Sequence, residues 1–392
     1  MLKMSKLRPL VFIGGGLLVA TSASAAPEDA FRPYVSYNVT RDDNLFRTAT
    51  DAEADTINQL SAGINVDLPI SRQHVLARAA VSKTQFSRFG DLDYSGRDML
   101  GQWNWQLGNL WSGDLGYSNS RTLASFADFQ QRLQNIRTQT GRFFDAAYQL
   151  HPEWRVKAGL SRYDLTNSAA SQSYVDSTSD TAQLALNYVS PTSSTVGLQV
   201  KRIDGNLPNR ELIIATLYDN SYRQTEYNAT ADWAFSGNSR FTGRLGYTKR
   251  AHDQVPERDF SGVAGRLGLS WVPAGKTSLD FAVWRELGSV DTGFASYFVT
   301  KGASITPTWA VGSKFNLQGR LSTENRDYRG DPRVIDFAAR QDKVRTLSLG
   351  AFYNPWRNTQ LGLNYQADRR NSNQAGADYA DNSLTASIRV DF

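Results

Sequence analysis

The sequence predicts an all-β protein: a transmembrane, antiparallel, up-and-down β-barrel of about 18 strands that follows a cleaved signal peptide. Three observations predict this class, namely a leader-like start, apolar–polar alternation over ten or more residues, and short and long connections that take turns. Alternation at period two is typical of a strand with two different faces. The chain has 392 residues and no cysteine, so its stability does not depend on disulfides.

The first 25 residues are expected to be a signal peptide. They contain Lys3, Lys6 and Arg8, then the apolar run PLVFIGGGLLVA, then the small-residue site Ala23-Ser24-Ala25. The apolar run is shorter than the roughly 20 residues of a membrane-spanning helix. Three of the positive charges belong to this leader, so the formal charge of +5 falls to +2 without it. That near-neutral remainder gives no indication of nucleic-acid binding, and residues 26–392 are expected to form the barrel.

A hairpin unit recurs about every 41 residues, which is the spacing between successive short connections. Longer polar segments separate them, so nine hairpins and 18 strands are expected, with both ends of the barrel on the short-turn side. A soluble β-sandwich also alternates, but its strands average five or six residues. Here the polar face is rich in Gly, Ser, Thr, Asn and Gln, as suits a confined aqueous interior. The short connections are expected near Pro69, Asn109, Pro152, Pro191, Gly237, Pro273, Gly312 and Pro355.

The final stretch, LTASIRVDF, is predicted to close the barrel. A sheet edge cannot lie open in lipid, so this strand must pair with the first one, residues 31–41. Its apolar face is predicted to contact lipid and, with the closing aromatic residue, to serve as the barrel-insertion signal. The alternative is an ordinary edge strand that ends in phenylalanine. The residues of this face are Leu384, Ala386, Ile388, Val390 and Phe392.

The side of each strand opposite the apolar side is predicted to line the interior. Interior charges of both signs set the path of ions and select solutes by the local field. A slight basic surplus would favour anions weakly; the alternative is that these side chains pair across strands and brace the wall. The lining candidates are Arg78, Arg155, Lys157, Lys201, Arg244, Arg266, Arg320, Asp232, Asp280 and Trp284, together with Asp67, Asp114 and Asp145.

No catalytic residue, cofactor or metal site is predicted. The sequence has three histidines, at positions 74, 151 and 252, and it lacks the HExxH, G-x-S-x-G and Walker motifs. One alternative is a hydrolase in which His252 acts with a serine of a neighbouring strand. A carboxylate pair for glycosidic cleavage is also open, since acids are plentiful. The acidic segments at 42–44 and 329–332 suggest calcium or adhesion, but such clusters are usually solvated turns.

The first strand and loop, YVSYNVTRDDNLFR, resemble the EpsL family of outer-membrane barrels, which are tied to exopolysaccharide biosynthesis in Gram-negative bacteria. A related group of β-barrel porins starts in a similar way. The resemblance implies a non-catalytic conduit for exopolysaccharide export. Its partners would be outer-membrane lipid, the polysaccharide, and periplasmic and inner-membrane synthesis and export proteins. The residues alone leave open a general or anion-preferring diffusion porin and a surface polysaccharide anchor. The resemblance is carried by Tyr34, Ser36 and Tyr37, followed by Asp42, Asp43, Asn44, Leu45, Phe46 and Arg47.

Overall fold

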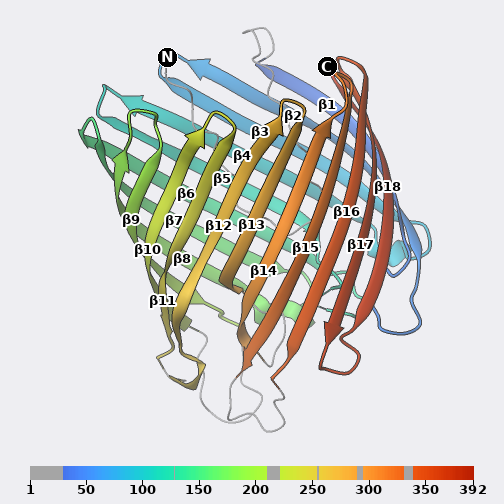
Figure 1. The fold of residues 1–392 in the computed structure, drawn as a ribbon. Coiled ribbons are helices and arrows are strands. Elements are labelled where there is room, and N and C mark those ends of the chain that lie inside the picture. Colours follow the sequence, from blue (N-terminus) through green and yellow to red (C-terminus); the bar gives the residue numbers. More distant parts are fainter. Residues whose placement is uncertain (1–29, 128, 210–220, 254–255, 289–294, 331–338) are drawn as a thin grey trace.

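The computed structural model describes residues 30–127, 129–209, 221–253, 256–288, 295–330 and 339–392, and these residues form one closed barrel (Figure 1). Its single antiparallel sheet has 18 strands, which confirms the predicted fold class. The predicted signal peptide, residues 1–25, lies outside the described residues. Among the described residues, no helix is long and apolar enough to cross a bilayer.

The strands are 12 to 16 residues long. Within the described ranges, three short 3-10 turns lie in the long connections: η2 (Gly90–Leu92), η3 (Ala170–Val175) and η4 (Pro256–Arg258). In chain order the strands are β1 (Phe31–Asp42), β2 (Asp55–Ile70), β3 (Gln73–Phe86), β4 (Tyr94–Leu107), β5 (Trp111–Leu123), β6 (Ile136–His151), β7 (Trp154–Asn167), β8 (Ser177–Val189), β9 (Thr195–Asn206), β10 (Ser221–Ser236), β11 (Ser239–Ala251), β12 (Phe260–Ala274), β13 (Thr277–Gly288), β14 (Ala295–Ala310), β15 (Phe315–Gly330), β16 (Gln341–Trp356), β17 (Thr359–Ser372) and β18 (Tyr379–Asp391).

The ring closes where β18 pairs with β1. Their register runs from Tyr34 opposite Asp391 to Asp42 opposite Ser383. The backbone N–H of Phe392 also donates to the carbonyl of Pro33 at 2.8 Å. The predicted pairing of the last strand with the first is therefore confirmed. The start of β1 and the end of β18 both lie beside the short turns, at the upper end of the view in Figure 1.

The outer face of the barrel is apolar over the half nearest the short turns. Leu198, Phe235 and Trp356 are each about two-thirds exposed on this face, at 70%, 67% and 69%. Exposed tryptophans gather beside the short turns, as in the aromatic girdle of outer-membrane barrels. They are Trp111, Trp154, Trp271, Trp309 and Trp356. The chain is therefore a barrel of the Gram-negative outer membrane, with its long connections at the opposite end.

Candidate functional site

A run of charged side chains crosses the inner wall from β9 to β13, and we call it the charge ladder. Lys201 Nζ lies 3.7 Å from Glu226 Oε1, and Arg244 Nη1 lies 3.0 Å from Glu226 Oε2. Glu286 accepts from Arg244 Nη2 at 3.0 Å and from Arg266 Nη2 at 2.7 Å. Arg244 stands directly opposite Arg266, a like-charge pair that would destabilise the sheet alone. Glu286 bridges the two guanidinium groups and offsets that repulsion.

Trp284 continues this wall. The Arg266 guanidinium lies 4.6 Å from the centre of the Trp284 ring, and the indole Nε1–H donates to Glu324 Oε2 at 3.2 Å. The facing residue is Gly302, where a Cβ would clash with the indole, so glycine makes room for the ring. Arg326 Nε lies 2.6 Å from Glu324 Oε1. Paired charges and one aromatic face therefore line the wall from β9 to β15.

The other predicted lining residues also lie on the inner face. Arg320, opposite Ser348, has no carboxylate partner within the described part of the chain. Asp114 stands directly opposite Asp145. The others have neighbours on the same face: Arg78 with Asp98, Lys157 with Asp145, Asp232 with Arg240, Asp67 with His74, Arg155 with Gln149, and Asp280 with Ser270. The arrangement favours the alternative in which most of these charges pair and brace the wall.

The expected basic surplus shrinks, because the sequence reading left three glutamates out of the lining. Glu226, Glu286 and Glu324 all face inward and pair with the ladder arginines or with Arg326. The signal that would have found them is strand parity. Glu286 is two residues from the inward Trp284, and such residues share a face of a strand.

The described residues of the connection between β5 and β6, 124–127 and 129–135, fold into the barrel mouth. Phe126 and Phe129 are buried there. The Phe46 ring makes edge-to-face contacts with Phe89 and Phe126 at 4.9 and 5.0 Å. Phe86 belongs to the inner face of β3, so this cluster sits on the interior side. We call it the mouth cluster; its buried members are Leu45, Phe46, Phe86, Phe89, Leu92, Phe126 and Phe129.

Polar contacts hold the same segment across about a third of the ring. The carbonyl of Ala127 accepts from Arg370 of β17, and Gln130 donates to the carbonyl of Arg47. Arg132 donates two hydrogen bonds to Asp91, at 2.7 and 3.0 Å. These bonds lower the pKa of the Asp91 carboxyl, so the pair stays charged below the ordinary range of an aspartate. The segment therefore narrows the mouth. Most of the connection between β9 and β10, residues 210–220, lies outside the described part of the chain.

The DDNLFR motif builds the corner where the barrel closes. Arg47 Nη1 lies 3.0 Å from Asp42 and 2.9 Å from Asp381 of β18. Asp43 accepts from the backbone N–H of Asn382 at 2.7 Å, and Asn44 Nδ2 donates to the carbonyl of Ala380 at 2.9 Å. Leu45 and Phe46 enter the mouth cluster. The carboxylates of Asp42, Asp43 and Asp381 gather within 4.8 Å, but Arg47 is already the cation of Asp42 and Asp381, and Asp43 is hydrogen-bonded to Asn382. The motif is therefore a fastening between β1 and β18.

Two of the three histidines contact acidic side chains. His252 is buried; its Nδ1 lies 3.5 Å from Asp259 and its ring lies beside Tyr222. His74 Nε2 lies 2.5 Å from Asp67 at a short turn. These contacts give no support to the hydrolase alternative. The segment RGDP extends into residues outside the described part of the chain.

Comparison with known proteins also finds outer-membrane β-barrels. Residues 224–392 match the family described as "Putative beta-barrel porin 2". This match covers less than half of the chain, so it is a likeness to porins over β10 to β18. The likeness agrees with the closed 18-stranded barrel of an outer-membrane protein. A search of curated proteins finds no match.

Solved porins share this fold. OccK2 (OpdF) of Pseudomonas aeruginosa, solved in complex with glucuronate, is 11% identical with a TM-score of 0.53; the alignment covers 93% of this chain and 99% of that one. OccK3 (OpdO) of the same organism is 12% identical at 0.51, covering 93% and 96%. A BenF-like porin of Pseudomonas fluorescens Pf-5 is 9% identical at 0.50, covering 93% and 99%. At such identities the likeness concerns the fold alone.

These comparisons lend no support to the exopolysaccharide link. That expectation came from the resemblance of residues 34–47, and the structure shows that part of this stretch closes the barrel. A closing corner is needed by any barrel of this build, whatever passes through it. The shared need to close a barrel explains the resemblance, so the resemblance is no evidence that this protein transports exopolysaccharide.

Proposed function

We propose that the protein is a passive diffusion channel for small polar solutes across the outer membrane. The observation that carries this proposal is a closed ring of 18 strands whose inner wall holds paired charges. Barrels of 16 to 18 strands leave an aqueous channel rather than a packed core. Such a wall offers hydrogen bonds along the path and performs no chemistry.

The pairing of the wall charges bears on selectivity. An ion pair has a weaker field at a distance than either charge alone, so a paired wall discriminates weakly between anions and cations. The charge ladder has three cations and two acids, which leaves a mild preference for anions. The Arg266 guanidinium can donate hydrogen bonds to a carboxylate group of a solute, and the Trp284 ring beside it presents an aromatic face. Small carboxylated or polyhydroxylated solutes suit this wall, and OccK2 has been crystallised with one such solute, glucuronate.

The narrowed mouth favours this function over polymer export. Residues 124–135 are held over part of the opening by a buried aromatic cluster and by contacts to β17. A thick, growing polymer would have to displace them, whereas a small solute would not. Exopolysaccharide export and surface anchoring remain hypotheses. Under the diffusion proposal, a deletion strain secretes and retains its polysaccharide normally but takes up small solutes more slowly.

The purified barrel is expected to conduct ions in a planar bilayer. Single barrels should insert as discrete current steps, and the size of each step should rise linearly with voltage. Under a salt gradient, the reversal potential should be small and should have the sign expected when anions are more permeant than cations. A matched preparation denatured by heat should give no steps. Absence of conductance from natively folded protein would exclude the diffusion channel.

Removal of one aromatic anchor of the mouth is expected to increase the conductance. Phe126→Ala deletes a ring that is 5% exposed, and a buried Phe→Ala change costs about 3–5 kcal/mol. The segment should then leave the mouth in part, giving larger and noisier single-channel steps. Phe235→Ala is the control, because the same change falls on the exposed outer face. Equal step sizes for Phe126→Ala and the unmodified barrel would show that the segment does not limit the path.

A further inference from the structure

A band of basic side chains surrounds the outer face at the end nearest the long connections. These residues share strand parity with the exposed outer aliphatic residues; Lys83, for example, stands directly opposite Leu60. Charges on the lipid face are costly near the bilayer centre and tolerated near the interface. The band therefore marks the level of the headgroups of the outer leaflet. We call it the basic girdle: Arg41, Lys83, Arg97, Arg121, Arg142, Arg162, Arg202, Arg223, Lys249, Arg285, Lys301, Lys343, Arg345 and Arg369.

One arc of the girdle, on β6 to β10, is neutralised by acids of the same face. Arg142 and Arg162 contact Asp164 at 2.9 and 3.3 Å. Arg202 and Arg223 contact Asp204 at 3.1 and 3.3 Å. Here the protein supplies its own counter-charges, so no external anion is needed.

The arc on β16 and β17 differs. Lys343, Arg345 and Arg369 are exposed, and no carboxylate of the described residues forms an ion pair with them. Arg345 stands directly opposite Arg369 in the ladder of backbone hydrogen bonds. Like charges placed directly opposite each other destabilise a sheet. An anion from outside the chain would remove this cost.

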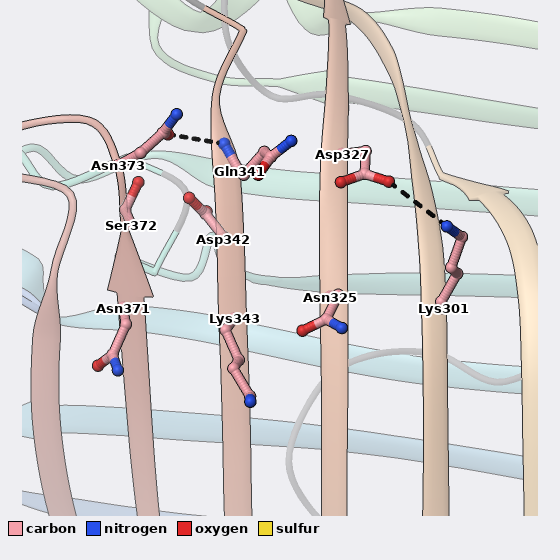
Figure 2. A pocket seen from close by; sticks show the side chains of 9 residues that line it. All are labelled: Lys301, Asn325, Asp327, Gln341, Asp342, Lys343, Asn371, Ser372 and Asn373. Atoms are coloured by element: carbon pink, nitrogen blue, oxygen red, sulfur yellow. Dashed lines mark hydrogen bonds and ion pairs between the residues drawn. The ribbon is translucent and has the colours of Figure 1, made fainter.

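Two hollows lie next to each other on this outer face, and the arginines line one of them. Toward the long connections lies a polar pocket of about 480 Å³, lined among others by Lys343, Asn325 and Asn371 and by Lys301, which pairs with Asp327 at 3.9 Å (Figure 2). Toward the membrane centre lies a largely apolar groove of about 750 Å³, which Arg345 and Arg369 also line. Lys343 and Arg345 are two residues apart on one strand, so the pocket continues the groove.

The groove has the shape and chemistry of a seat for acyl chains. Its floor is formed by small outward residues, Ala303, Ala367 and Ala380, and its walls include Ile305, Leu321 and Leu347. Small side chains between bulky ones leave a depression in the apolar surface. A ligand that fills both hollows must therefore carry a polar head and apolar tails.

We propose that this face of β13 to β18 binds a phosphorylated, acylated glycolipid of the outer leaflet. Arginine pairs with phosphate through two parallel charge-assisted hydrogen bonds, and basic clusters at the membrane interface bind anionic lipid headgroups. A phosphate lies between Arg345 and Arg369, the sugar headgroup occupies the polar pocket, and acyl chains follow the groove. A second copy of this chain fits less well, because it would bring one basic girdle against another.

The test is lipid binding to the full barrel in zwitterionic detergent, followed by native mass spectrometry. The probes are diphosphoryl lipid A, its dephosphorylated form, and phosphatidylcholine. Arg345→Gln combined with Arg369→Gln is expected to weaken lipid A binding at least about tenfold for each arginine, because hydrogen bonds to charged groups contribute about 1.5–3 kcal/mol each. Arg202→Gln is the matched control, since it makes the same change in the neutralised arc and should leave binding nearly unaltered. Unchanged channel conductance verifies that each variant is folded.

Several outcomes would overturn the proposal. They are unchanged lipid A binding in the double variant, an equal loss in Arg202→Gln, or an altered oligomeric state with unaltered lipid binding. If the double variant fails to fold, the unmodified barrel still decides, because binding of dephosphorylated lipid A as tight as binding of the diphosphoryl form would exclude a phosphate site. Loss of conductance alone bears on the proposed channel and leaves the lipid site unaffected.

Discussion

Replacement of Glu286 by glutamine is expected to convert the weakly selective barrel into an anion-preferring one. Glu286 is the carboxylate between Arg244 and Arg266, at 3.0 and 2.7 Å. Glutamine keeps the volume and can still accept a hydrogen bond, but it removes one negative charge from the inner wall. The charge ladder then has three cations and one acid, so its field on a passing ion becomes clearly positive.

The expected size follows from Coulomb's law. A unit charge about 5 Å from an ion in water changes its energy by roughly 0.8 kcal/mol, about a fourfold change in local concentration before salt screening. The reversal potential under a salt gradient should therefore shift toward that of chloride, by about two- to fourfold in permeability ratio, and more at low salt.

The control for this experiment is Asp180→Asn, which removes the same charge from the outer face, where the side chain is 58% exposed. Its permeability ratio should not change. Arg266→Gln should shift the ratio in the opposite direction. If Glu286→Gln and Asp180→Asn behave alike, the ladder does not face the conducting path.

The alternation of apolar and polar residues, together with the turn residues between the strands, was sufficient to predict most of the barrel. The eight short connections were placed within a few residues, because proline, glycine and asparagine mark turns locally. The closing strand was predicted from Leu384, but β18 begins at Tyr379, five residues earlier. The missed part contains Asp381 and Asn382, which make polar contacts at the corner and so break the alternation.

Features built from distant segments could not be predicted. Phe126 and Phe129 lie in a polar stretch without period, and they are buried only because Phe46 and Phe89 arrive from two other connections. The basic girdle was missed for another reason. The sequence reading took the whole apolar side of each strand as lipid-facing hydrocarbon surface, whereas arginines such as Arg345 and Arg369 occupy that side near its outer end.

Arg47→Ala is expected to destabilise the barrel strongly at the corner where β1 and β18 close. The Arg47 guanidinium contacts Asp42 and Asp381, whose side chains are 6% and 0% exposed. Removal of one partner of a buried ion pair costs about 3–5 kcal/mol, because the remaining charge is left uncompensated. Two carboxylates would be left together at the closing corner. Alanine also keeps the left-handed backbone at this position (φ 58°), so the guanidinium is the main loss.

The free energy of unfolding can be measured by urea denaturation of the barrel in lipid vesicles, followed by tryptophan fluorescence. Arg88→Ala is the matched control, because Arg88 pairs with Glu53 at 3.4 Å while its side chain is 60% exposed. Such an exposed pair contributes about 0–1 kcal/mol. Asp381→Asn added to Arg47→Ala should restore part of the loss, since it removes one of the two buried carboxyl groups left side by side and the two sites are in contact. An Arg47→Ala loss no greater than that of Arg88→Ala would mean that the corner between β1 and β18 is held by backbone pairing alone.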